Sequence, residues 1–208
     1  MKKTLCFLSG MILALSVLLC AVILPALSAD RFEQALLSTV DRQALGMSES
    51  SLSAFAEETM RYLRGQKPAW EPDVPFPVAE SFHVHMAEVR GWVSAAPWGI
   101  GLGLLVGLGF LWLGGWQRRP ALWGVYALVG LVIGVLIWAA ADFASFWRLL
   151  HRFFIPGGIF AAHEPVMQLF PLSLFFRYVT PVAVSMIGHV AALWTGLCIL
   201  TKKREESQ

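Results

Sequence analysis

The sequence has 208 residues, of which 57% are hydrophobic and only 14% are charged, and its mean hydropathy is +0.62. A soluble globular domain usually has about a quarter charged residues, so this composition excludes an ordinary soluble domain and indicates an integral membrane protein. The net charge of +2 gives no reason to expect a nucleic-acid partner. The length suits a single membrane domain over residues 1–208.

Four apolar runs are each long enough to cross about 30 Å of hydrocarbon, because an α-helix rises about 1.5 Å per residue. In the second run, the pattern Gly103-x-x-x-Gly107 is typical of helices that approach one another closely. The sequence therefore predicts an all-α integral membrane protein with transmembrane helices over residues 5–27, 93–116, 121–141 and 179–200.

The first apolar run has an alternative interpretation as a cleaved signal peptide, since Ala26-Leu27-Ser28 is similar to a cleavage site. The apolar region of a signal peptide covers about 7–15 residues, and this run is longer. Its length favours an uncleaved first span.

Basic residues cluster beside the predicted spans and indicate their orientation. With four spans, all the clusters fall on one side of the membrane, which the positive-inside rule assigns to the cytoplasm. Both termini are then cytoplasmic, and residues 29–92 and 142–178 face outward. The clusters are Lys2 and Lys3, then Arg118 and Arg119, then Lys202, Lys203 and Arg204.

The first outward segment has an amphipathic pattern that predicts helical structure over residues 30–65. Within it, residues 47–52 open a helix with Ser48 or Ser50 as a candidate N-cap, and this helix ends at Arg64-Gly65. Four prolines within residues 67–78 predict a loop. Residues 79–92 then predict a short helix that leads into the second span.

The second outward segment places Trp147 and His151 one helical turn apart if the third helix continues, and the Ile155-Pro156-Gly157-Gly158 sequence should stop it. Residues 166–176 are apolar but too few to span the bilayer, and Pro171 interrupts them. We expect this stretch to lie in the outer interface or to re-enter it.

Several polar residues deserve a functional and a structural interpretation. His85 and Glu88 lie at i and i+3, so the carboxylate is placed to hold the imidazole in one tautomer. A lone histidine such as His163 is more commonly a polar residue at headgroup level. His189 lies within the fourth span, where polar side chains are costly and often functional.

The cysteines Cys6, Cys20 and Cys198 lie in apolar runs without metal-ligand spacing, and we expect neither a metal nor a cofactor.

Four stretches in order along the chain resemble the bacterial lipoprotein intramolecular transacylase (Lit) family. The stretches are Leu45–Ser48 with Tyr62–Gly65, His85–Arg90, Asp142–Phe154 and Leu169–Phe176. The second stretch resembles the family pattern H-M-x-D-V-K, with Glu88 in place of the aspartate and Arg90 in place of the lysine. The third resembles D-F…F-H-x-x-F-F, with Leu150 in place of the phenylalanine before the histidine, and the fourth resembles L-F-P-x-x-F-F, with one more residue between Pro171 and Phe175.

The resemblance implies an acyltransferase that moves the sn-2 acyl chain of a diacylglyceryl-modified lipoprotein to the amino group of its N-terminal cysteine, which gives the lyso-form. It implies catalysis by His85 and His151. We expect the site at the outer leaflet of the bacterial cell membrane, in contact with membrane lipid. The residues expected to support or orient it are Glu88, Arg90 and Asp142, and those expected to contact substrate are Phe153, Phe154, Phe170 and Phe175.

Two alternatives belong to other functional classes. A non-enzymatic membrane interaction or assembly factor would act through the outward helix 32–65. A transporter would need ionisable residues deep in its spans, and only His189 is one. The sequence leaves the oligomeric state open.

Overall fold

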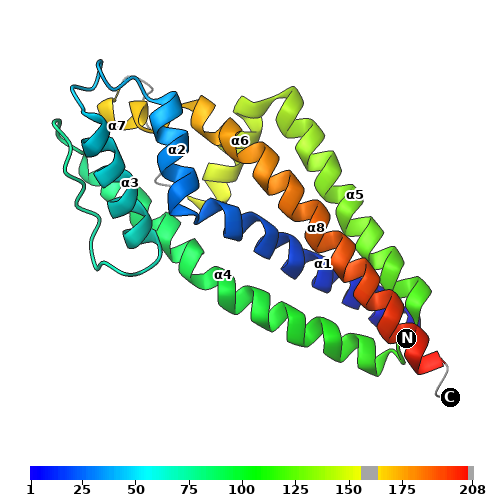
Figure 1. Cartoon of the computed structure of the whole chain (residues 1–208). Helices are drawn as coiled ribbons and strands as arrows, with labels where there is room; N and C mark the ends of the chain where they lie inside the picture. Colours follow the sequence, from blue (N-terminus) through cyan, green and yellow to red (C-terminus); the bar gives the residue numbers. More distant parts are fainter. Residues whose placement is uncertain (156–163, 206–208) are drawn as a thin grey trace. The chain divides into compact units, whose positions relative to one another are not determined.

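The computed structural model describes residues 1–155 and 164–205, without the side chains of Lys203 and Glu205. These residues form eight helices and no strand (Figure 1). Four helical stretches are long and apolar enough to cross a membrane: α1, α4, α5 and the stretch Pro165–Lys202, which contains α7 and most of α8. The helices are α1 (Lys2–Ala26), α2 (Ala29–Thr39), α3 (Glu49–Leu63), α4 (Glu80–Leu113), α5 (Arg118–Ala141), α6 (Phe143–Phe154), α7 (Pro165–Gln168) and α8 (Leu172–Glu205).

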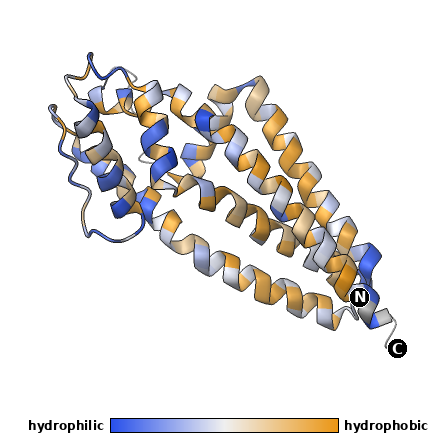
Figure 2. Cartoon of the chain, viewed as in Figure 1, coloured by the Kyte–Doolittle hydropathy of each residue, from blue (hydrophilic) through white to orange (hydrophobic). Residues whose placement is uncertain are grey.

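The predicted class, an all-α membrane protein with four transmembrane helices, is therefore confirmed, and the helical segments between spans one and two and between spans three and four are present. Figure 2 shows hydrophobic residues along most of α5 and hydrophilic residues concentrated on α2 and α3. The chain divides into two compact units. Unit 1 contains Met1–Val22, Ala96–Phe146 and Val184–Gln208, and unit 2 contains Ile23–Ala95 and Trp147–Ala183.

In unit 1, α1 packs closely against both α4 and α5. A Cβ atom added to Gly10 of α1 would collide with the backbone of Ala121, and one added to Gly124 of α5 would collide with the backbone of Phe7. On the α4 side, a Cβ added to Gly107 would lie 2.7 Å from the Leu13 side chain. The predicted small-xxx-small pattern thus faces α1, as close helix packing requires.

Of the four candidate spans, α1 has the largest buried fraction. Its side chains Cys6, Leu13 and Ala14 are in the core of unit 1, and Ser9 donates a hydrogen bond of 2.7 Å from Oγ to the carbonyl of Gly107. Removal of α1 would leave this core open. Retention of this first span in place of cleavage stays a prediction.

In unit 2, residues 30–65, predicted to be helical with a helix start at residues 47–52, form the two helices α2 and α3. α2 ends at Thr39, and Gly46, which has a φ of +64°, lies in the turn that precedes α3. Asp41 stabilises this turn, because its Oδ1 accepts the backbone N–H of Ala44 at 3.1 Å. α2 ends where the backbone of Val40 becomes extended, and the positive φ of Gly46 belongs to the turn that leads into α3.

Both predicted ends of α3 are confirmed. Ser48, and not Ser50, is the N-cap, since its Oγ accepts the backbone N–H of Ser51 at 3.0 Å. Arg64 is the C-cap, and Gly65 follows with a φ of +77°.

The segment between α5 and α8 differs from a simple continuation of the third span. α5 ends at Ala141, and α6 begins after a break at Asp142. The Asp142 Oδ1 accepts the backbone N–H of Ser145 at 3.0 Å, which caps the new helix. As predicted, Pro171 interrupts the apolar stretch 166–176, with α7 before it and the first turn of α8 after it. The predicted helix 79–92 is the first part of the continuous α4.

Candidate active site

The two histidines singled out from the sequence lie side by side in unit 2. His85 comes from α4 and His151 from α6, and their ring centroids are 6.0 Å apart with an angle of 16° between the planes. The His151 side chain is almost completely buried, with 5% exposed, and His85 is half-buried. Two nearly parallel imidazoles at this separation can contact neighbouring atoms of one substrate.

A hydrogen bond within α6 sets the orientation of His151. Its Nδ1 lies 3.0 Å from the backbone carbonyl of Trp147, one turn earlier. A carbonyl oxygen only accepts hydrogen bonds, so Nδ1 carries the proton and donates it. In the neutral ring, the remaining nitrogen Nε2 then has the free lone pair, which is the form that a general base requires.

Aromatic rings enclose His151 on the side of α6 and α8. The Trp147 ring lies 4.3 Å from the His151 ring by centroid, and the Phe175 ring of α8 lies 5.0 Å from Trp147. The indole therefore fills the space between the histidine and α8. Such close rings limit the positions that His151 can adopt.

His85 rests against a larger aromatic cluster, which consists of Phe32, Phe55, Trp70, Phe82 and Phe170. Phe82 lies 5.5 Å from the His85 ring, 5.3 Å from Trp70 and 5.7 Å from Phe170. Phe170 in turn contacts Phe55 of α3 at 5.9 Å and Phe32 of α2 at 6.3 Å. Each such pair adds about 0.5–1.5 kcal/mol beyond the burial of its area, so the cluster fixes the first turn of α4 against α2 and α3.

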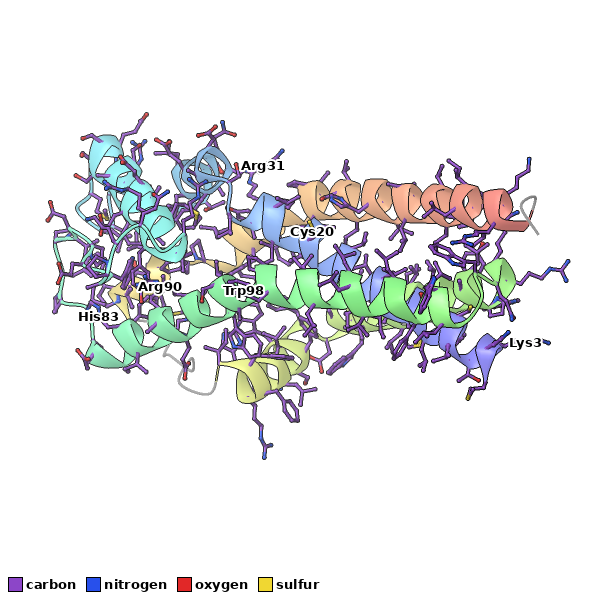
Figure 3. All side chains as sticks on the ribbon, turned by 90° about the horizontal axis from the view of Figure 1, so that it is seen from below. Lys3, Cys20, Arg31, His83, Arg90 and Trp98 are labelled. Carbon is purple, nitrogen blue, oxygen red and sulfur yellow. The ribbon has the colours of Figure 1, made fainter. Side chains whose placement is uncertain are left out.

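The loop between α3 and α4 is joined to α4 by two side chains that Figure 3 labels, His83 and Arg90. The His83 Nδ1 donates to the carbonyl of Trp70 at 3.0 Å. The Arg90 guanidinium donates to the carbonyl of Pro68 at 2.9 Å and lies 4.8 Å above the Tyr62 ring. Arg90 thus holds the loop and α3 against the helix that carries His85. Its supporting role in the site stays a prediction.

Glu88, one turn after His85 on α4, has a buried Oε2 that accepts no hydrogen bond from any residue that the structure describes. Its predicted role, to orient His85, stays a prediction. Asp142 belongs to unit 1 and caps α6, the helix on which His151 lies nine residues later in the sequence. The structure therefore shows that Asp142 caps the start of α6, and its predicted supporting role in the site stays a prediction.

The four phenylalanines predicted to contact substrate have different surroundings. Phe170 belongs to the aromatic cluster, and Phe175 contacts Trp147. Phe153 is 71% exposed, and Phe154 is 51% exposed, with its ring 5.3 Å from that of Trp92. The structure thus brings Phe175 near His151 through Trp147 and leaves Phe153 open to the surroundings.

His163 lies outside the described residues. The His189 Nδ1 lies 2.8 Å from the carbonyl of Ser185 on its own helix, a structural partner that a polar group in a span needs.

Sequence reasoning missed Phe82 and Trp70. Phe82 is one turn before His85 and was detectable by spacing, whereas Trp70 lies in a loop without periodicity.

Comparisons with known proteins show the family and the fold of this chain. A family model described as "Lipoprotein intramolecular transacylase Lit" matches residues 5–187. A search of curated proteins finds no match.

Solved structures of the membrane integral lipoprotein intramolecular transacylase Lit from Bacillus cereus share the fold. One, of a variant with a histidine replaced by arginine, has a TM-score of 0.76 and 14% identity, over 100% of this chain and 95% of that one. A second has a TM-score of 0.74 and 13% identity, over 100% and 99%. A third, with a histidine replaced by alanine, has a TM-score of 0.76 and 14% identity, over 99% and 96%. Since the family model covers most of the sequence, the chain belongs to the lipoprotein intramolecular transacylase family, Lit.

Proposed function

We propose that this membrane acyltransferase moves the sn-2 acyl chain of a diacylglyceryl-modified lipoprotein to the α-amino group of the lipoprotein's N-terminal cysteine. The product is the lyso-form lipoprotein, with an amide-linked chain on the amine and one chain left on glycerol. Family membership supports an enzyme over the alternative of an assembly factor that acts through residues 32–65. The observation that carries the proposal for this chain is the His85–His151 pair, whose centroids are 6.0 Å apart.

The reaction needs no atom from outside the substrate. The amine nitrogen bonds to the carbonyl carbon of the sn-2 ester, and the bond from that carbon to the glyceryl oxygen breaks. The nitrogen loses one proton and the glyceryl oxygen gains one, so the histidine pair begins and ends in the same protonation state. Transfer within one molecule makes orientation the main requirement, and orientation alone can supply several kcal/mol of the barrier reduction.

His151 is the stronger candidate for the group that takes the amine proton. The hydrogen bond from its Nδ1 to Trp147 leaves Nε2 as an acceptor, and the ring is buried. His85, parallel to it and half-buried, then faces the same substrate at the ester. A general base or acid in such a position typically accelerates proton transfer about 10²–10⁴-fold.

The acceptor amine is itself the nucleophile, so the protein has no need of a serine or cysteine nucleophile. The three cysteines, Cys6, Cys20 and Cys198, belong to unit 1, and the histidine pair belongs to unit 2. We therefore expect direct transfer without an acyl-enzyme. The aromatic and apolar walls around the pair would keep water from the ester and suppress hydrolysis to free fatty acid.

We also propose that both termini are cytoplasmic and that unit 2 works at the outer leaflet of the bacterial cell membrane. Support comes from unit 1, where the predicted basic clusters lie near one another. Lys3 lines the same cavity as Arg118 and Arg119, and the Arg204 guanidinium lies 5.7 Å above the Trp116 ring. Basic residues gathered at one end of the spans fit the positive-inside rule.

The test is mass spectrometry of a diacylglyceryl lipopeptide incubated with the purified full-length protein. Wild-type protein should convert the diacylglyceryl form to the lyso-form without a change in total mass, which fragmentation distinguishes. His85→Ala and His151→Ala should each lower the rate about 10²–10⁴-fold, whereas Cys20→Ala should leave it near wild type. Equal rates in all four proteins would contradict the proposal.

Intact-protein mass spectrometry during turnover separates direct transfer from a two-step route. The expected result is unmodified protein at every time point. A chain that gains the mass of one acyl group, and loses it when substrate is consumed, would replace direct transfer with a covalent mechanism.

A further inference from the structure

Unit 1 contains a cavity that the acyl-transfer reaction does not use. Its volume is about 1060 Å³, and the first turns of α1 and α5 form its walls. Pockets that bind small molecules typically measure about 300–1,000 Å³, so this space is large enough for a ligand. The two helices approach closely at Gly10 and Gly124, which places their first turns beside each other.

Three cations line this cavity: Lys3 of α1, and Arg118 and Arg119 of α5. Figure 3 shows the Lys3 side chain extending away from the end of α1. None of the three forms an ion pair with a carboxylate among the described residues. Arg118 donates to the Cys198 sulfur at 3.2 Å, a weak neutral acceptor that leaves its charge uncompensated.

Acidic residues are scarce in the whole unit. Its sequence contains only Asp142, Glu205 and Glu206, and Asp142 follows the far end of α5. Among the described residues no carboxylate pairs with the three lining cations, so their charges give the cavity a positive potential. Such a site attracts an anion.

The remaining walls are apolar or aromatic, and they are as important as the charges. Phe7, Pro120 and Trp123 also line the cavity, and Trp123 is 66% exposed. An inorganic anion would satisfy the cations but would leave these surfaces uncovered. A molecule with an anionic head and an apolar body would satisfy both.

We propose that this cavity binds an anionic phospholipid of the membrane, with its phosphate at Lys3, Arg118 and Arg119 and its upper acyl chains against Phe7 and Trp123. The cavity lies at the end of apolar helices where basic residues gather, which is the depth of the headgroups. The phosphate of the bound lipid would interact with Lys3 of α1 and with Arg118 and Arg119 of α5, and would so link the two helices. The site is independent of the acyl-transfer assignment, which concerns unit 2.

The experiment measures lipid binding by the full-length protein in a neutral detergent, from the rise in its thermal unfolding temperature as lipid is added. The probes are phosphatidylglycerol, phosphatidylcholine with the same acyl chains, and glycerol 3-phosphate. The double variant Lys3→Gln with Arg119→Gln removes two of the lining charges. Its matched control is Lys2→Gln with Arg61→Gln, which removes the same charge from positions that do not line the cavity.

Phosphatidylglycerol should stabilise the wild-type protein at lower concentration than phosphatidylcholine, and glycerol 3-phosphate should have little effect. Each basic group near an anionic lipid changes its affinity about fivefold, so the lining double variant should bind phosphatidylglycerol roughly 25-fold more weakly. The control should bind as wild type. Equal stabilisation by the two phospholipids, an unchanged lining variant, or equal binding of glycerol 3-phosphate would each overturn the proposal.

Discussion

The Nδ1 atom of His151 donates a hydrogen bond of 3.0 Å to the backbone carbonyl of Trp147, and the same two residues have their rings 4.3 Å apart. One turn of α6 therefore determines both the tautomer and the plane of this imidazole. The hydrogen bond uses a main-chain acceptor, so it persists whatever side chain stands at position 147. The ring contact, in contrast, depends on the indole, and the two effects can be separated by substitution.

His151→Asn should keep the fold and lose the reaction. An asparagine amide can donate to the Trp147 carbonyl as Nδ1 does, but it has no group in place of Nε2 that can accept a proton at neutral pH. We expect a rate about 10²–10⁴-fold below wild type, with an unchanged thermal unfolding temperature. Lipopeptide conversion and unfolding of the same preparation measure the two quantities. A rate near wild type would assign His151 a structural role only.

Trp147→Ala should lower the maximal rate more than it raises the substrate concentration needed for half of that rate. Without the indole, His151 keeps its backbone hydrogen bond but gains space to move, and a displacement of about 1 Å can cost about 100-fold in rate. Trp147→Phe should retain most activity, because a smaller ring still packs against the imidazole. Trp98→Ala, at an 82% exposed tryptophan of unit 1, is the control and should behave as wild type. Similar losses at positions 147 and 98 would contradict this role.

Glu88→Gln should be milder than His85→Ala. Glu88 lies one turn from His85, and its buried Oε2 accepts no hydrogen bond from a described residue. A carboxylate that only orients the imidazole contributes less than the imidazole itself, so we expect a loss smaller than the roughly 10²–10⁴-fold expected for His85→Ala. Conversion rates of both variants, measured side by side, decide this. A loss as deep as that of His85→Ala would make the carboxylate a principal catalytic group.

The sequence predicted the helices well because apolar length and helix caps are local signals. The four spans follow from continuous apolar runs, and the cap at Ser48 and the end at Gly65 follow from residues within a few positions of each other. The helical segment and the start of its second helix near Ser48 were predicted, but the end of α2 at Thr39 was not, because amphipathic spacing continues through the turn that contains Asp41 and Gly46. The sequence shows a glycine at position 46, but it does not show that this glycine adopts a positive φ.

The candidate site was predictable only in part. The resemblance to a family, and not periodicity, paired His85 with His151, which are on different helices. The support of His85 by Phe82 and Trp70 depends on how a proline-rich loop returns to α4, and a loop has no repeating pattern to read. The tautomer of His151 depends on a backbone carbonyl one turn away, which requires α6 to be helical through Trp147.

Labelling of single cysteines should place the ends of the chain on the cytoplasmic side. Ser50→Cys lies at an exposed position of α3, and Ser207→Cys lies outside the described residues. An impermeant thiol reagent added to whole cells should label position 50 and spare position 207 until the membrane is opened, because the basic clusters orient the spans. The reverse pattern would show that the topology is inverted.

Gly124→Ala should destabilise unit 1, and Gly130→Ala on the same helix should not. A Cβ at position 124 would collide with the backbone of Phe7, and backbone of α1 cannot move aside without disturbing its contacts with α4. At position 130 a Cβ would meet nothing within 4 Å, and alanine there should be neutral or stabilising by up to about 1 kcal/mol, since it forms helix better than glycine. The pair therefore separates tight packing from helix propensity within α5. Thermal unfolding in detergent should show a lower midpoint for Gly124→Ala, together with less folded protein in the membrane. If the two variants unfold at the same temperature, α1 and α5 do not pack as closely as Gly10 and Gly124 indicate.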